Sequence, residues 1–306
     1  MDLGITLPTS GPHASPDGIV RMARGAEELG YASVWTYERL LYPLADVPQP
    51  GGPPRPLPDH YRVTYEPLET LAYIAAHTRN VTLGVSVLAA LFHVPVVLAR
   101  RLATLDRFSG GRVVAGLGQG WIRQEFTAAN VPPRRRGRGF EEFIAALRAA
   151  WGPDPVSFSG SFYRIPRGEV APKPMRTNGI PILVGGFAPA AIERAGRVAD
   201  GFNPIAVSYR ALAGMVERFR AAARRAGRDP AGLRVVVRAN VPMTGEPLTG
   251  DRPFLGGSPE QIAEDLRRLA ELDIDHVMFT NLVQPPLDDQ LRLLDRLAGT
   301  AARTPH

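Results

Sequence analysis

The chain has 306 residues, of which 44% are apolar and 22% are charged, with 31 glycines, 30 prolines and no cysteine. This is a globular composition, and it excludes a disordered chain, a collagen and a coiled coil. Without a thiol, the protein has no disulfide, no cysteine nucleophile and no cysteine-ligated metal centre. Its chemistry must therefore come from other side chains or from a cofactor.

The net charge of +6 is carried by 35 arginines and one lysine, Lys173. The one dense basic run is Arg134–Arg138. We interpret it as a solvated loop ahead of a helix, with an anion site as the alternative. No aromatic residues interleave with it, so we expect no nucleic-acid partner.

The apolar segments of the sequence predict neither a signal peptide nor a membrane-spanning helix. Met1–Pro8 has no basic region of the signal-peptide type, and Val85–Ala99 is shorter than the roughly 18 residues that span a bilayer. We expect a soluble, cytoplasmic protein without a membrane partner, in the reducing compartment that the absence of cysteine also favours.

Short β-branched runs bounded by glycine or proline predict strands, and amphipathic stretches between them predict helices. The predicted strands are Asp2–Leu7, Ser33–Thr36, Val81–Leu88, Arg112–Gly116, Ile180–Val184, Asp200–Pro204, Leu233–Val241 and His276–Thr280. The predicted helices are Pro16–Leu29, Pro67–Thr78, Pro95–Phe108, Gly139–Trp151, Pro189–Val198, Tyr209–Ala226, Pro259–Leu272 and Leu287–Ala301. Ser15 and Ser258 are predicted N-caps, and Gln261 completes a capping box with Ser258.

Eight strands and eight helices in strict alternation require a parallel sheet with right-handed crossovers. The pattern predicts an α/β protein in which residues 1–306 form one (β/α)8 barrel domain. A doubly wound open sheet is the alternative.

Two insertions interrupt this alternation. Pro43–Pro58 contains seven prolines after the second strand, which places it at the C-terminal face of a barrel, where a long loop is typically a lid or a binding wall. Disordered decoration is the alternative. The insertion Gly152–Gly179 precedes the fifth strand and contains an extended pair around Ser157–Tyr163, so we interpret it as a packing and assembly surface on the opposite face.

Two glycine-rich segments follow predicted strands. Gly116–Trp121 lacks the third glycine of a dinucleotide fingerprint, but Gly118, Gln119 and Gly120 can bring the backbone close to a flat ring or a phosphate. Plain turn glycines are the alternative. The segment Gly185–Pro189 leads directly into a helix whose free N–H groups favour an anion.

Several segments in chain order carry a family resemblance. They are Ser33–Arg39 with Leu41–Pro43, Leu83–Leu88, Leu98–Asp106, Ser109–Arg112, Gly116–Trp121, Gly185–Gly186 and Ala199–Phe202. Together they span nearly the whole chain. They resemble the bacterial-luciferase-like superfamily, and within it the F420-dependent oxidoreductases.

The resemblance implies a TIM barrel, usually as a homodimer, with a flavin or deazaflavin at its C-terminal face. It places a non-prolyl cis peptide bond that supports the ring at Ser86–Val87. It also places phosphate contacts at Gln119, Gly186, Phe187 and Ala190. Relatives commonly have Ser or Thr where Phe187 and Ala188 stand, so here only backbone N–H groups are left to bind.

Many F420-dependent relatives have an Asp-His pair after the second strand, where this chain has Glu38-Arg39. Arg39 cannot shuttle protons at neutral pH, but it can hold an anionic substrate or the charge of a reduced ring. A structural ion pair with Glu38 or with an acid on a neighbouring strand is the alternative. Glu38 or Tyr37 is then the candidate acid.

The six histidines do not form a metal-binding pattern, and no metal is predicted. His77 and His276 are expected to be structural. His13, His60 and His93 follow strands or close the proline-rich loop on the functional face, where each is a solvated loop residue or a substrate contact.

The predicted function is hydride transfer between F420 and a small organic substrate. The alternatives are an FMN-dependent monooxygenase of the same superfamily and a catalytically silent, cofactor-binding member. The predicted catalytic residues are Tyr37, Glu38 and Arg39. The predicted cofactor-binding residues are Ser86, Val87, Gly118, Gln119, Gly120, Gly185, Gly186, Phe187, Ala188 and Ala190.

Overall fold

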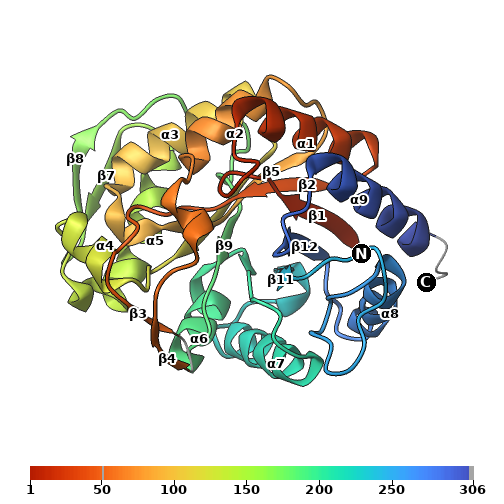
Figure 1. Cartoon of the computed structure of the whole chain (residues 1–306). Helices are drawn as coiled ribbons and strands as arrows, with labels where there is room; N and C mark the ends of the chain where they lie inside the picture. Colours follow the sequence, from red (N-terminus) through yellow and green to blue (C-terminus); the bar gives the residue numbers. More distant parts are fainter. Residues whose placement is uncertain (50–51, 303–306) are drawn as a thin grey trace.

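The computed structural model describes residues 1–49 and 52–302, and its centre is a closed barrel of parallel strands (Figure 1). Each barrel strand pairs with the next one along the chain, and the last closes against the first. The strands are β1 (Asp2–Thr6), β2 (Ser33–Thr36), β5 (Thr82–Ala89), β6 (Val113–Gly118), β9 (Ile182–Val184), β10 (Gly201–Phe202), β11 (Arg234–Val241) and β12 (His276–Asn281). The predicted barrel is confirmed, and the open sheet is excluded.

A ring of helices covers the barrel, as predicted. They are α1 (Pro16–Glu28), α2 (Pro67–Ala75), α3 (Pro95–Phe108), α5 (Arg138–Trp151), α6 (Pro189–Val198), α7 (Tyr209–Arg225), α8 (Pro259–Ala270) and α9 (Leu287–Ala302). Ser15 caps α1, and Ser258 forms the predicted capping box with Gln261 on α8. None of the described helices has both the length and the apolar character needed to cross a membrane.

Several elements differ from the prediction. The short helix α4 (Arg123–Ala128) after β6 was not predicted, and the predicted strand Asp200–Pro204 is reduced to β10. The N–H groups of Asp200 and Asn203 still donate to the neighbouring strand, at Ile182 and Val184. The ladder thus continues past the assigned strand, but Pro204 has no N–H with which to extend it.

The barrel interior is filled in layers, because alternate residues of every strand point inward. The middle layer is apolar and consists of Trp35, Val114, Leu183, Val236 and Met278. Below it, towards the N-terminal ends of the strands, His276 Nε2 lies 2.7 Å from Ser33 Oγ. Above it lie the inward positions that border the mouth of the barrel.

The proline-rich segment Pro43–Pro58 is not structureless. It forms the antiparallel hairpin β3 (Val47–Gln49) and β4 (Gly52–Arg55), although Pro50 and Gly51 lie outside the described residues. Proline is compatible with a two-stranded ribbon because its missing N–H can face away from the partner strand. Val47 and Leu57 are buried against Ile122, which follows β6. The described part of the segment is therefore an ordered hairpin anchored through Val47 and Leu57 to the residues after β6, rather than a disordered decoration.

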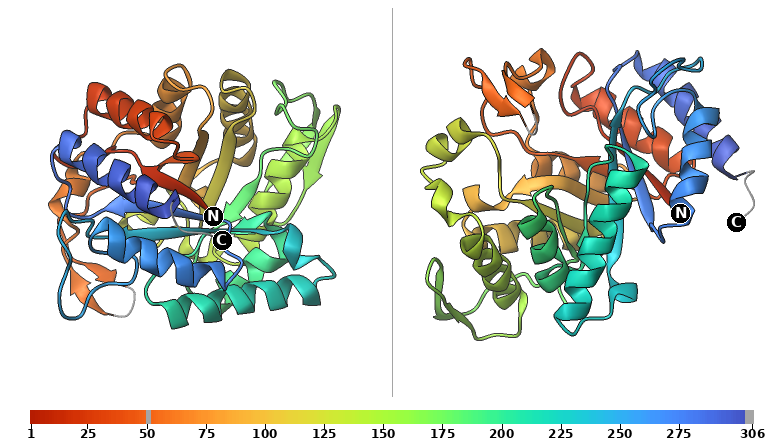
Figure 2. Two further views of the ribbon diagram at one scale, coloured as in Figure 1. Left: turned by 90° about the vertical axis from the view of Figure 1, so that its right-hand side faces the viewer. Right: turned by 90° about the horizontal axis from the view of Figure 1, so that it is seen from below.

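The second insertion forms the hairpin β7 (Val156–Ser159) and β8 (Arg164–Gly168), as the extended pair predicted. It packs against α5, where Glu142 accepts hydrogen bonds from the N–H groups of Ser161, Phe162 and Tyr163. Figure 2 shows the two hairpins at opposite ends of the barrel, β3–β4 in orange and β7–β8 in yellow-green. These contacts show that the hairpin packs against α5 of its own chain, and the assembly role of this surface stays a prediction.

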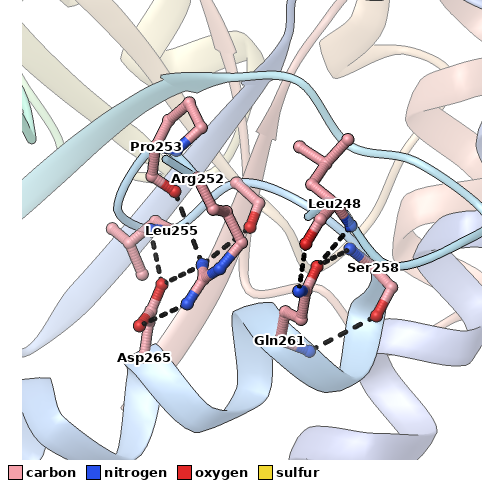
Figure 3. A network of polar contacts seen from close by, with 8 residues as sticks. Leu248, Arg252, Pro253, Leu255, Ser258, Gln261 and Asp265 are labelled. Carbon is pink, nitrogen blue, oxygen red and sulfur yellow. Dashed lines mark hydrogen bonds and ion pairs between the residues drawn. The ribbon is translucent and has the colours of Figure 1, made fainter. Parts of the chain in front are cut away.

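The loop between β11 and α8 is braced by a polar network (Figure 3). The buried carboxylate of Asp265 accepts hydrogen bonds from Arg252 Nη1 at 2.6 Å and from the N–H of Leu255 at 2.7 Å. The side chain of Gln261 exchanges hydrogen bonds with both backbone groups of Leu248. Because a buried ion pair with additional hydrogen bonds fixes one geometry, this loop is held rigidly over the C-terminal end of the barrel.

The buried histidine at the lower end of the barrel makes stability depend on pH. Burial lowers the pKa of His276 to about 4, whereas an unfolded histidine titrates near 6.5. The unfolded chain therefore binds the extra proton first as the pH falls. We expect His276 to remove about 2 to 3 kcal/mol from the free energy of unfolding between pH 7.5 and 4.5.

Urea unfolding at the two pH values measures this effect, with His276→Gln as the comparison that removes the titrating ring. The parent should lose about 2 to 3 kcal/mol more than the variant. Equal losses in both proteins would show that His276 does not titrate as its burial requires.

Candidate active site

The Ser86–Val87 segment of β5 lies at the mouth of the barrel, and its peptide bond is cis, at the position that the resemblance indicated. The side chain of Val87 occupies the space beside two glycines. A Cβ added to Gly118 would lie 2.5 Å from Val87 Cγ2, and one added to Gly185 would lie 3.0 Å from Val87 Cγ1. These two glycines are therefore required by the packing of Val87.

Ser86 is buried, and its hydroxyl is held by Asn203. Ser86 Oγ donates to Asn203 Oδ1 at 2.6 Å, and Asn203 Nδ2 donates to the carbonyl of Val236 at 2.6 Å. This chain of hydrogen bonds links β5, β10 and β11 below the mouth. Asn203 was not singled out from the sequence.

The segment after β6 is tied to the basic run. Gln119 Oε1 accepts a hydrogen bond from the N–H of Gly137 at 2.6 Å, and Gly120 adopts φ +73° beside Phe92. Residues Pro133–Arg135 form a short 3-10 helix ahead of α5, and Arg134, Arg136 and Arg138 are exposed. The basic run is thus the predicted exposed segment before a helix, positioned by Gln119.

The segment Gly185–Ala188 leads into the N-terminus of α6. Ala188 is its N-cap residue and offers no side-chain hydrogen bond to the helix. Within the part of the chain that the structure describes, the N–H groups of Gly186, Phe187 and Ala188 donate to no protein group. Phe187, Ala188 and Ala190 are exposed, so this helix end is open to a ligand.

Tyr37 takes an inward position two residues beyond Trp35 and is buried. Its hydroxyl is hydrogen-bonded to Ser10 Oγ, and burial raises the pKa of the phenol above its ordinary value. Tyr37 therefore carries its proton at neutral pH. A pocket beside it is lined by residues that follow β1 and β12, among them Ser10, His13 and Gln284.

Glu38 takes the opposite orientation to Tyr37, because successive residues of an extended chain alternate. Its carboxylate accepts hydrogen bonds from the N–H of Ala89 at 2.6 Å and pairs with His93 Nε2 at 2.7 Å. Ala89 is the last residue of β5, and His93 lies in the connection from β5 to α3. Glu38 is therefore directed at that connection, and His93 is its partner.

Arg39 forms an ion pair with Glu125 on α4. Arg39 Nη1 lies 3.0 Å and 3.2 Å from the two carboxylate oxygens, and the N–H of Leu40 also donates to Glu125 at 3.0 Å. The two side chains are only 13% and 3% exposed. Burial raises the pKa of Glu125, and Arg39 with the neighbouring amide groups opposes that shift.

Two aromatic rings flank this ion pair. The Arg39 Cζ lies 5.4 Å from the ring centre of Tyr61 and 5.7 Å from that of Trp121. Arg39 thus has the ion-pair partner that one of the two interpretations required, although the acid is on α4 and not at Glu38. Its charge is compensated within the protein.

Arg238 on β11 is an interior residue that the sequence analysis missed. Its Nε donates to Asn240 Oδ1 at 2.8 Å, its Nη1 donates to the carbonyl of Ser86, and its Cζ lies 5.3 Å from the Tyr37 ring centre. The sequence holds a signal for it: Val236, Arg238 and Asn240 alternate along the predicted strand, so the last two place polar groups at inward positions near the mouth.

The remaining histidines differ in position. His13 Nε2 lies 3.3 Å from the carbonyl of Gln284, and the His60 ring packs on Tyr61 at 4.1 Å between ring centres. His77 lies outside the barrel beside Tyr73. Among residues 1–49 and 52–302, no group of three or more metal-ligating side chains comes together.

The Arg39–Glu125 pair can be tested by a double-mutant cycle. Removing one partner leaves a buried charge alone, so we expect Arg39→Ala and Glu125→Ala each to lower the free energy of unfolding by about 3 kcal/mol. The double variant should lose less than the sum, with a coupling of at least about 1.5 kcal/mol. Arg123→Ala, exposed on the same helix, is the control. A coupling near zero by urea unfolding would contradict the assigned pair.

Comparison with known proteins identifies the family of this chain and shows relatives with the same fold. The luciferase-like monooxygenase family model matches residues 1–247. An uncharacterised protein of Mycobacterium tuberculosis is 30% identical over 311 aligned residues, covering 99% of each chain. An FMNH2-dependent dimethylsulfone monooxygenase of Pseudomonas putida is 37% identical over 132 residues, which is 42% of this chain and 36% of that protein.

A solved structure of an F420-dependent secondary alcohol dehydrogenase, in complex with an F420–acetone adduct, shares the fold. It has a TM-score of 0.79 and 17% sequence identity, and the match covers 98% of both chains. The family model and the full-length relative together establish the family. The chain belongs to the luciferase-like monooxygenase family.

Proposed function

We propose that this protein transfers a hydride between coenzyme F420 and a small organic substrate bound at the mouth of the barrel. The observation that carries the proposal is the open N-terminus of α6, whose N–H groups face the same end of the barrel as Tyr37 and Arg238. A phosphate-bearing cofactor with a flat ring needs an anion site and a polar surface of this kind at one end of the barrel.

The residues present fit such a cofactor. The N–H groups of Gly186, Phe187 and Ala188 lack protein partners and would hold the phosphate, helped by the helix dipole. Val87 and the inward-facing side chains above the apolar layer would support the ring. When bound, a deazaflavin exchanges a hydride at one ring carbon, whereas a reduced flavin can also activate oxygen.

The protein's own contribution to the reaction is orientation and proton transfer. Tyr37 holds a proton at its phenol oxygen beside the pocket that Ser10 also lines. From there it can donate a hydrogen bond to a carbonyl oxygen of the substrate and move its proton to that oxygen as a hydride arrives. We therefore assign the acid role to Tyr37 and a positioning role to Glu38, which holds the β5–α3 connection.

Aromatic side chains line one wall of the mouth beside Tyr37. Tyr61 from the segment after the proline-rich hairpin contacts Tyr37 edge-on, with 5.9 Å between ring centres. Arg39, held by Glu125, lies between Tyr61 and Trp121. A bound cofactor and substrate that displace water from this aromatic wall would strengthen the electrostatic interactions beside it.

An FMN-dependent monooxygenase is the second candidate. The sequence likeness to the FMNH2-dependent dimethylsulfone monooxygenase favours it, and the same anion site at α6 would take the phosphate of FMN. The third candidate is a silent, cofactor-binding member, because Arg39 is engaged by Glu125 and stands where many F420-dependent relatives have His.

Titration of the purified protein with oxidised F420 and, separately, with FMN tests the cofactor. We expect F420 to bind with a change in its absorbance, and the reduced form to be oxidised by a carbonyl compound. A tight complex with FMN alone would favour the monooxygenase, and binding of F420 without turnover over a broad substrate panel would favour the silent member. Binding of neither cofactor would contradict all three.

The phosphate position is tested by Ala188→Asp, with Ala188→Asn as the neutral control. A carboxylate at the N-cap stabilises α6 but repels a phosphate at the same N–H groups. We expect the Kd for the cofactor to rise at least tenfold more in the Asp variant than in the Asn variant, while the thermal midpoint stays level or rises. Equal Kd values in the two variants would place the phosphate elsewhere.

A further inference from the structure

Arg238 is a cation inside the mouth of the barrel whose charge the described part of the protein leaves uncompensated. Arg39 is paired with Glu125, whereas Arg238 makes no ion pair with any described residue. Its hydrogen-bond acceptors are the neutral oxygens of Asn240 and Ser86, and its Nη2 has no protein partner among the described residues. The ionisable groups that influence it are Tyr61, Tyr37 and Arg39, and none of these is a carboxylate.

The position of Arg238 limits how far solvent can compensate the charge of its guanidinium. Arg238 is partly buried inside the barrel, one inward step above Val236 of the apolar layer. Burial lowers the pKa of its guanidinium, and the nearby charge of Arg39 adds to the effect. An arginine nonetheless stays protonated at physiological pH. A partly buried cation that is held by neutral groups alone is a site that a negatively charged ligand atom would stabilise.

In the proposed function, the cofactor ring carries such a charge in its reduced form: the charge arises when the ring accepts a hydride from the substrate and is lost when the ring gives the hydride back. A hydride carries two electrons and one proton, so the net charge of a cofactor ring becomes more negative by one unit when the ring accepts it. The charge spreads over oxygen and nitrogen atoms of the ring, which a planar guanidinium can pair with through more than one N–H.

We propose that Arg238 binds the negative charge of the reduced cofactor ring and so sets the reduction potential of the bound cofactor. Its hydrogen bonds to Asn240 and Ser86 aim the guanidinium before the cofactor arrives, and the Tyr37 ring beside it shields one side from solvent. A fixed charge of this kind needs no reorganisation when the reaction occurs. This inference rests on the proposed function and adds to it a residue that favours the reduced state.

The test measures the Kd of the oxidised and the reduced forms of F420, and of FMN, under anaerobic conditions. In Arg238→Met the Kd of the reduced form should rise at least tenfold relative to that of the oxidised form, which lowers the midpoint potential of the bound two-electron couple by about 30 mV. Arg238→Lys keeps the charge and should stay within threefold of the parent ratio.

Two further variants complete the design. Arg238→Gln removes the charge but keeps a hydrogen-bond donor for the carbonyl of Ser86. We expect the same change in the Kd ratio as in Arg238→Met, and Arg238→Gln serves as the neutral variant if Arg238→Met does not fold. Arg234→Met removes one exposed arginine from the same strand at the other end of the barrel and should leave the ratio unchanged.

An equal change in both Kd values, or none, in the two neutral variants would overturn the role of Arg238. If the parent protein binds neither cofactor, the proposed function itself fails, and the role of Arg238 fails with it. The two failures are thus distinguished by the behaviour of the parent.

Discussion

The apolar layer across the middle of the barrel is the constraint on which the site depends. Five buried side chains pack together across the interior, namely those of Trp35, Val114, Leu183, Val236 and Met278. The next inward positions on the same strands then border the mouth. Tyr37 follows Trp35 there and Arg238 follows Val236, while Gly185 follows Leu183 and makes room for Val87.

The charges around the mouth follow from the same geometry. Glu38 points away from the interior and pairs with His93, and the two aromatic rings at the rim enclose a compensated pair, Arg39 with Glu125. What faces the interior is a neutral phenol and one uncompensated guanidinium. This combination suits reversible hydride transfer, in which the guanidinium holds the negative charge of the reduced ring and the phenol gives its proton to the substrate oxygen as the hydride leaves that ring.

Much of the architecture is predictable because barrel strands and their helices repeat a short local pattern. The helix caps at Ser15 and Ser258 and the alternation of strands and helices are local signals. These signals were sufficient to predict the barrel from the sequence. The hairpin within Pro43–Pro58 was missed because a ribbon of two edge strands tolerates proline, which is otherwise evidence against a strand.

The site is only partly predictable, because its contacts join distant segments. Tyr37, Glu38 and Arg39 are adjacent in the chain, yet their side chains bond to different partners. These partners are Ser10, His93 and Glu125, respectively. The partner of Arg39 lies 86 residues away on a helix that has no strong sequence signal. Arg238 could have been found from its spacing to Val236, but its importance comes from the missing carboxylate, which only the three-dimensional arrangement reveals.

A crystal structure of the protein with oxidised F420 tests the central claim most directly. The account predicts the phosphate at the N–H groups of Gly186–Ala188, with the ring beside Val87 and within hydrogen-bonding distance of Arg238. A phosphate held by the basic run Arg134–Arg138, or a ring outside the barrel mouth and remote from Arg238 and Tyr37, would contradict it.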